Sequence, residues 1–152
     1  MRTVFVGTLT VLALGAISLL VSATAHEPGT YESPIVEKRV KRFKQSGADI
    51  QAVFKKHLPA GDYAAIEAAA LRMAAWGDEM PDAFPVGSRS VGADDALWDN
   101  FPDFKAKSEA MAEASRALKA AAGSGDKASV AAAAKRVGGT CKSCHDSYRI
   151  KH

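Results

Sequence analysis

The sequence predicts an all-α protein folded as an antiparallel four-helix bundle. Apolar residues recur at steps of three and four in four separate stretches of the 152 residues, which is the spacing of amphipathic helices. No stretch reads as a strand, and the chain is rich in alanine and lysine, which favour helix. Short turns and one long connection separate the four stretches, as in a bundle.

The first two helices are predicted from their caps and apolar faces. The first begins at Ser33 and Pro34, which suit an N-cap and a first turn, and ends at "LPAGD", residues 58–62. Its stripe consists of Val36, Val40, Phe43, Gly47, Ile50 and Phe54. The second starts at Asp62 as its N-cap and ends near Gly77. Its apolar face consists of Tyr63, Ile66, Ala70 and Met73.

A long connection, residues 78–95, precedes the last two predicted helices and is rich in Pro, Gly and Ser. The third helix begins between Ala96 and Asp103 and ends at "GSGD", residues 123–126. Its stripe consists of Phe104, Ser108, Met111, Ser115 and Leu118. Asp126 caps the fourth helix. The stripe of that helix consists of Val130, Ala134, Val137, Cys141, Cys144 and Tyr148.

Residues 1–25 have the features of a secretory signal peptide. Arg2 precedes an apolar run, and "ATA" at residues 23–25 has the small residues of a cleavage site. An uncleaved membrane anchor is the alternative, because the run approaches the length of a membrane span. The interrupting Gly and Thr residues and the cleavage site favour removal. We therefore expect an exported single domain, residues 26–152, without stable membrane insertion.

The charge pattern argues against a nucleic-acid partner. The chain has 20 basic and 17 acidic residues, and it contains no basic run and no basic patch interleaved with aromatic residues.

The chain's two cysteines, Cys141 and Cys144, lie three residues apart in the predicted last helix, and His145 follows directly. A structural zinc site would need a second pair of ligands, and no other cysteine exists. A thioredoxin-like pair favours a strand–helix junction, helical geometry disfavours a disulfide at this spacing, and free buried thiols are uncommon in exported proteins.

C-x-x-C-H is also the signature of covalent haem attachment, and this is the interpretation we prefer. Thiols at positions i and i+3 lie on one side of a helix, where they can form thioethers with the two vinyl groups along one haem edge. The adjacent histidine then reaches the iron. We expect one haem c, bound through Cys141 and Cys144, with His145 as the metal ligand.

The segment "GGTCKSCHDSYR", residues 138–149, resembles the C-terminal haem motif of the cytochrome c′ family, the class II c-type cytochromes. "RVKRFKQSG" at 39–47 resembles the family's first-helix motif, and "ALWDNFPDFKAK" at 96–107 resembles the start of its third helix. The resemblance covers essentially the whole predicted mature chain. It implies a haem near the C-terminal helix of a four-helix bundle and a periplasmic location.

The resemblance also assigns the distal face of the haem. Low-spin, six-coordinate relatives place a methionine on the first helix in the pattern R-x-x-x-M-K, and this sequence has Phe43 at that position, four residues after Arg39. A phenylalanine has no donor atom for iron and resembles the apolar cap of the high-spin cytochromes c′. An ordinary core aromatic is the alternative. The other candidate ligands, Met73, Met80, Met111 and His57, fit core, surface or distant positions better.

Four further residues are assigned to the haem site through the resemblance. Arg39 aligns with an arginine near the haem propionates, and Phe84 with an aromatic of the distal pocket. Arg149 borders the proximal side, one turn after His145, and Tyr148 ends the apolar stripe beside it. For both arginines, a solvated surface charge is the alternative.

These assignments predict a periplasmic protein with five-coordinate, high-spin haem that binds NO and CO and is also capable of one-electron transfer with an unidentified redox partner. An apolar distal face favours NO and CO over O₂, which needs a hydrogen-bond donor. A six-coordinate, low-spin electron-transfer cytochrome is the alternative. No acid–base pair or distal histidine suggests an enzyme.

The family commonly forms homodimers through its first two helices, so the resemblance predicts a homodimer here. Four apolar residues of these helices lie off the main stripes and are candidates for that surface: Ile35, Val53, Leu58 and Leu71. The alternative is that several of them complete the core.

Overall fold

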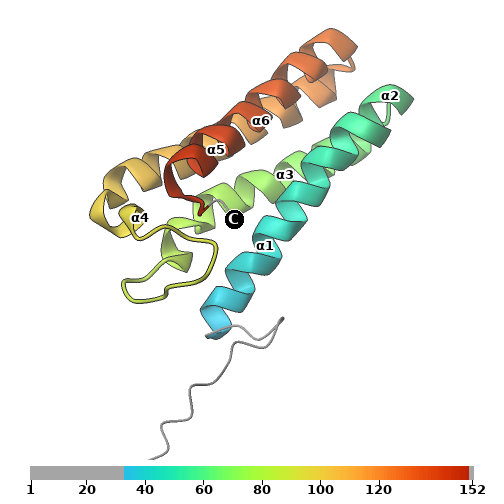
Figure 1. Ribbon diagram of the computed structural model, residues 1–152. Helices are drawn as coiled ribbons and strands as arrows, with labels where there is room; N and C mark the ends of the chain where they lie inside the picture. The colour runs from blue at the N-terminus through green and yellow to red at the C-terminus, as the bar shows by residue number, and fades with distance from the viewer. Residues whose placement is uncertain (1–32, 151–152) are drawn as a thin grey trace, which may run out of the picture. The chain divides into compact units, whose positions relative to one another are not determined.

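Four long helices form the fold in the computed structural model, which describes residues 33–150 (Figure 1). The predicted signal peptide, residues 1–25, and the predicted start of the mature chain lie outside the described residues. The long helices are α1 (Pro34–Ala52), α3 (Tyr63–Glu79), α5 (Phe101–Ser124) and α6 (Lys127–Tyr148). The short elements are η1 (Val53–His57), α2 (Leu58–Ala60), η2 (Pro81–Ala83) and α4 (Ala96–Asp99).

Successive long helices run in opposite directions, so the predicted antiparallel bundle is confirmed (Figure 1). Helix α1 packs on α3, α3 on α5, and α5 on α6, with the most extensive interface between α3 and α5. Within residues 33–150, no helix combines the length and the apolar character needed to cross a membrane.

The helix ends follow the capping residues that the sequence predicts. Ser33, Asp62 and Asp126 each accept a hydrogen bond from a backbone N–H in the first turn of α1, α3 and α6 respectively. Gly125 ends α5 with a left-handed conformation, at φ 72°. Residues 96–103, where the third helix was predicted to begin, contain the short helix α4 and the first turn of α5. Pro102 lies in that first turn.

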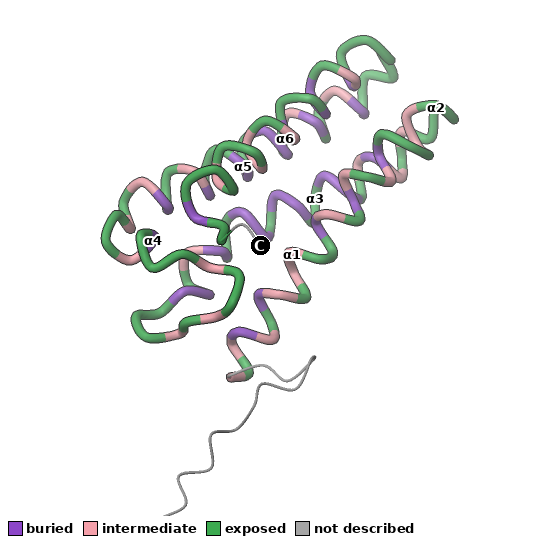
Figure 2. Tube along the Cα trace, in the orientation of Figure 1, coloured by how far each residue is buried: buried purple, intermediate pink, exposed green. Residues whose placement is uncertain are grey.

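The core is built from the predicted stripes of the last three long helices (Figure 2). All five predicted stripe residues of α5 are buried, and Ile66, Ala70 and Met73 are buried on α3. On α6 the predicted stripe is buried at Val130, Ala134, Val137 and Tyr148 and is half-buried at Cys141 and Cys144.

The first helix differs from its prediction near its end. Phe54, expected in the core, is 39 % exposed, whereas Val53, expected on the dimer surface, is fully buried. Val53 lies four residues after Asp49 and seven after Ser46, so it continues the buried face that these two residues mark on the first helix. Residues 53–57 then form a π-helical turn, and Phe54 lies within it. The core position expected for Phe54 is therefore wrong, and the burial of Val53 agrees with the alternative that it completes the core.

The buried face of α1 also contains polar residues that hydrophobic periodicity does not show. Arg39, Ser46 and Asp49 are buried there. The carboxylate of Asp49 accepts two hydrogen bonds from Arg72 of α3, at 2.6 Å from Nη2 and 3.1 Å from Nε. This bidentate pair compensates the buried charge and ties α1 to α3.

Helices α3 and α5 approach closely at Gly77. A Cβ atom at this position would lie 2.8 Å from both the Cβ and the backbone nitrogen of Ala112. Ser108 of α5 donates a hydrogen bond of 2.5 Å to the Gly77 carbonyl at the same crossing. The lack of a side chain at Gly77 is therefore what allows the two backbones to meet.

We expect Gly77→Ala to destabilise the protein by about 1–3 kcal/mol, because the added methyl group forces the helices apart. Gly123→Ala is the control, since its Cβ would meet only Glu67 Oε1 at 3.7 Å. That change should leave stability equal or raise it by up to about 1 kcal/mol. Thermal unfolding followed by circular dichroism measures both, and equal stability of the two variants would contradict the close crossing.

Candidate functional site

The two cysteines occupy the half-buried part of an otherwise buried helical stripe. Cys141 and Cys144 are free thiols that pack against the core cluster, and the flanking Val137 and Tyr148 are buried. Burial raises the pKa of Cys141, and it raises the pKa of Cys144 to about 11. The helix therefore presents two neutral thiols side by side at the margin of the core.

His145 follows the cysteines and is exposed. Partial burial and the nearby charge of Arg149 lower its pKa, which favours the neutral imidazole that binds metals. Arg149 itself caps the end of α6 and is also exposed, and its backbone N–H donates to the carbonyl of His145 at 3.2 Å.

The ring of Phe43 contacts two buried aromatic side chains. Its ring centroid is 5.1 Å from that of Trp76, with the planes nearly perpendicular at 88°, and 6.2 Å from that of Phe84. Phe43 itself is only half-buried, although it packs against the core cluster. One part of its ring is therefore left uncovered by the protein.

Phe84, which the resemblance assigns to the distal pocket, is 4 % exposed. Its ring centroid lies 4.9 Å from that of Phe104 on α5, and its carbonyl accepts a hydrogen bond of 3.1 Å from the Trp98 indole. The structure thus brings Phe84, from the long connection, to Phe43 on α1.

Arg39 is 1 % exposed, so the alternative of a solvated charge is wrong for this residue. Its guanidinium lies 4.3 Å from the ring centroid of Phe84. It donates hydrogen bonds to the Ala83 carbonyl at 3.3 Å, to Ser88 Oγ at 2.8 Å and to the Ser88 carbonyl. Arg39 therefore fixes residues 83–88 against α1, and its predicted contact with a propionate stays a prediction.

Tyr148 connects α6 to α5. Its ring centroid is 5.6 Å from that of Phe104, and its hydroxyl donates to Asp103 Oδ2 at 2.6 Å. Burial and this hydrogen bond raise the pKa of Tyr148 to about 12. The tyrosine is thus held as a neutral donor one turn after Cys144 and His145.

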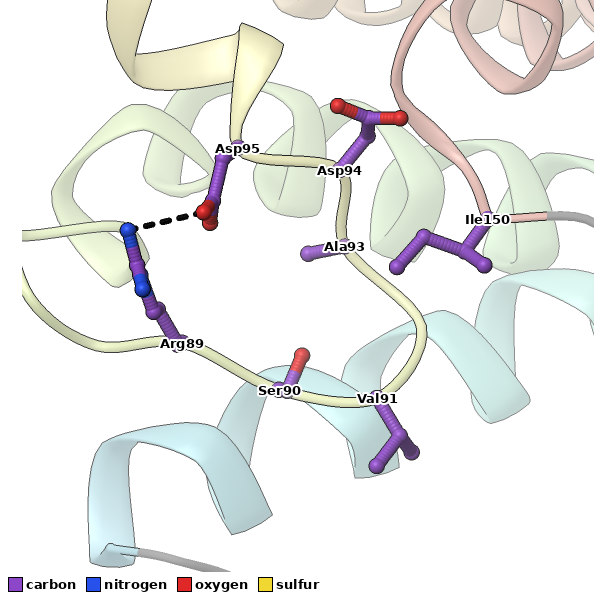
Figure 3. A pocket seen from close by; sticks show the side chains of 7 residues that line it. All are labelled: Arg89, Ser90, Val91, Ala93, Asp94, Asp95 and Ile150. Carbon is purple, nitrogen blue, oxygen red and sulfur yellow. Dashed lines mark ion pairs between the residues drawn. The ribbon is translucent and has the colours of Figure 1, made fainter.

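The far end of the long connection meets the end of α6. Asp94 N–H donates to the Tyr148 carbonyl at 3.0 Å, and Ile150 N–H donates to the Gly92 carbonyl at 3.3 Å. A cavity of about 450 Å³ lies here, lined by Ile150, by residues 89–91 and by residues 93–95. An ion pair of 2.8 Å joins Arg89 and Asp95 on its wall (Figure 3). Its lining includes none of the predicted site residues.

Sequence reasoning missed three residues that organise this region: Trp76, Trp98 and Asp103. Trp76 lies three residues after Met73 and so continues the predicted face of the second helix, a signal that could have found it. Trp98 and Asp103 act through hydrogen bonds to Phe84 and Tyr148, and no periodic pattern indicates such contacts.

The residues present fit a covalently bound haem. A row on α1 is apolar but only half-buried: Val40, Phe43, Gly47 and Ile50. The two thiols of α6 are half-buried as well, and Phe43, Ile50 and both cysteines pack against the same core cluster. Apolar surface left open beside two thiols and an imidazole suits a flat apolar group bound through sulfur and nitrogen.

The family model described as Cytochrome C′ matches residues 34–149. The chain belongs to the cytochrome c′ family. Members of this family are haem proteins and not enzymes, and the family implies a covalent haem c, in agreement with the two cysteines near the C-terminus. The cytochrome c′ fold also agrees with the observed bundle.

Relatives of this chain include proteins named cytochrome c-556 and cytochrome c′. It is 38 % identical over 125 residues to cytochrome c-556 of Agrobacterium fabrum, covering 80 % of this chain and 84 % of the relative. It is 32 % identical over 145 residues to cytochrome c′ of Rhodospirillum rubrum, covering 91 % and 95 %. A nitric oxide complex of a mutant of cytochrome c prime from Alcaligenes xylosoxidans is a similar solved structure, with a TM-score of 0.69 and 27 % identity, covering 80 % of this chain and all of that one.

The Tyr148 hydroxyl gives this cytochrome c′ chain a specific alkaline response. The pKa is about 12 in the folded protein against 10.0 for a free side chain, so the stabilisation it provides is complete below pH 10 and is lost as the pH rises toward 12. We expect the free energy of unfolding to fall more steeply over this interval in the wild type than in Tyr148→Phe. Urea unfolding at a series of pH values measures both slopes, and equal slopes would contradict the assignment.

Proposed function

We propose that this chain binds one haem c through Cys141 and Cys144, with His145 as the protein ligand of the iron, and that it binds NO and CO. The observation that carries the proposal is the position of Phe43. At the place where six-coordinate relatives have a methionine, the chain has a ring without a donor atom, held between Trp76 and Phe84.

The residues of the chain have distinct roles in this proposal. Cys141 and Cys144 hold the haem through thioethers, and the neutral imidazole of His145 supplies a nitrogen ligand. Phe43 and Phe84 make the distal face apolar, which favours CO and NO over O₂ because neither ring donates a hydrogen bond. The bound haem supplies an open coordination position and a one-electron couple.

Two further observations support this function. The methionines that could compete as ligands, Met73, Met80 and Met111, are buried within the core, at most 7 % exposed. A similar structure was solved as a nitric oxide complex, which makes NO the first natural ligand to test. The predicted export of residues 26–152 to the periplasm and an unidentified redox partner belong to the same proposal.

The coordination of the iron is tested by optical spectra of the ferrous protein with and without CO. We expect a high-spin spectrum that changes on CO addition, and the same behaviour in Phe43→Leu, which keeps an apolar cap. Phe43→Met should convert the iron to the low-spin form and lower its CO affinity, because a thioether then competes for the open position. A sharp low-spin wild-type spectrum that CO leaves unchanged would instead support the electron-transfer cytochrome.

We also propose that the chain forms a homodimer through α1 and α3. Two large apolar side chains of residues 34–79 remain open to solvent, Leu71 at 51 % and Phe54 at 39 % exposure, and Ile35 and Leu58 are half-buried. Phe54 thus replaces the buried Val53 among the candidates for this surface.

Leu71→Glu should convert the dimer to a monomer, because a carboxylate would be desolvated within the interface. Val86→Glu, at a loop position that is 92 % exposed, is the matched control and should leave the dimer intact. Analytical ultracentrifugation of the holoprotein measures the association state. A wild-type monomer, or a Leu71→Glu dimer of unchanged affinity, would refute this interface.

A further inference from the structure

Trp76 is the largest of the fully buried side chains, with 1 % of its surface exposed, and it lies in the last turn of α3. Its indole N–H has no hydrogen-bond partner among the described residues. A buried N–H is normally paired. Because this one has no partner, ring contacts rather than a hydrogen bond hold the indole. Its neighbours therefore define what the side chain does.

Two consecutive residues of α1 contact this indole. The ring of Phe43 meets it edge to face at 5.1 Å, and the guanidinium of Arg42 lies 5.6 Å from its ring centroid. Arg42 is in turn paired with Glu79 of α3, at 2.9 Å between Nη2 and Oε1. The indole is thus enclosed between α1 and its own helix.

The ring of Phe43 can move toward Trp76 or Phe84 only if that neighbour yields. Trp76 and Phe84 both contact its ring, and they are 1 % and 4 % exposed. Protein interiors are close-packed, so a buried indole has little free volume into which to move. Movement of the Phe43 ring is therefore opposed on the side where Trp76 lies.

We propose that Trp76 is a positioning residue for Phe43 and that it sets the rate at which a diatomic ligand reaches the iron. The inference rests on the proposed function, in which Phe43 caps the open coordination position. Trp76 does not need to touch the ligand to act, because its effect is to hold the cap in place. The ion pair between Arg42 and Glu79 supports the indole from the outside.

The principal test is the CO association rate of ferrous Trp76→Phe, measured by stopped flow. This variant breaks no hydrogen bond of the described residues, so we expect it to fold. Loss of the larger ring should speed CO association by up to about tenfold, the factor that corresponds to complete loss of one aromatic pair. Met73→Leu, a volume-conserving change on the same buried face, is the matched control and should keep the wild-type rate.

A second pair of variants keeps the proposal testable if the indole cannot be replaced. Asp78 and Glu79 are neighbours that each form an exposed interhelical ion pair, Asp78 with Arg116 and Glu79 with Arg42. Of these two pairs, only the Glu79 pair includes a residue that contacts Trp76. Glu79→Gln should therefore speed CO association about twofold, because an exposed ion pair contributes little free energy. Asp78→Asn should leave the rate unchanged. Equal rates for the two variants would contradict the proposal.

Two spectroscopic readouts separate a packing effect of Trp76 from a direct contact with the ligand. The spin state of each ferrous variant should match the wild type, because no ligand to iron changes. The infrared C–O stretching frequency of the CO complex should also be unchanged in Trp76→Phe. A shifted frequency would show that the indole N–H donates to the ligand, and would overturn the positioning role.

The outcomes distinguish this inference from the function on which it rests. A wild-type protein that binds no CO refutes the proposed function. A wild-type protein that binds CO, together with a folded Trp76→Phe of unchanged association rate, refutes the role of Trp76 alone.

Discussion

The buried guanidinium of Arg39 is the interaction on which the packing of residues 83–88 against α1 depends. A charged group that is 1 % exposed is costly unless its donors are used, and Arg39 directs them to Ala83 and Ser88. Its planar face also covers the ring of Phe84. A single side chain of α1 thus fixes part of a connection that has no long helix of its own and sets Phe84 beside Phe43.

From Phe84 the aromatic contacts continue to the opposite end of the chain. Phe84 meets Phe104 at 4.9 Å between centroids, and Phe104 meets Tyr148 at 5.6 Å. Residues proposed for the distal and proximal sides of the haem therefore belong to one packed cluster. Because close-packed side chains transmit displacement, a change at Phe43 is mechanically connected to the last helix, which carries Cys144 and His145.

Local pattern was sufficient to predict much of this architecture. The stripes of α5 and α6 and the caps Ser33, Asp62 and Asp126 follow from side-chain spacing and hydrogen-bonding chemistry, which act over a few residues. The cysteine motif likewise contains its chemistry within five positions. The role proposed for Phe43 required the resemblance, because a phenylalanine on an apolar stripe has by itself no signature of a distal cap.

What could not be predicted depends on contacts distant in sequence. Arg39 bonds to residues 44 and 49 positions away, and the buried carboxylate of Asp49 is paired with Arg72, 23 positions away. Neither is visible to a hydrophobic pattern, which assigns charged residues to the surface. Val53 was assigned to a surface because it lies off the apolar stripe, yet it continues the buried face of Ser46 and Asp49, which a hydrophobic pattern does not show.

The π turn at residues 53–57 has a consequence for comparing members of the family. One residue corresponds to about 100° of rotation in a regular helix. The wider turn at 53–57 therefore changes which residues face the core between α1, which precedes it, and α2, which follows it. Evolution can thus lengthen or shorten the chain by one position here while both faces keep their partners. If a relative lacks this turn, an alignment of the two sequences without a gap would pair inward-facing with outward-facing positions on one side of the segment.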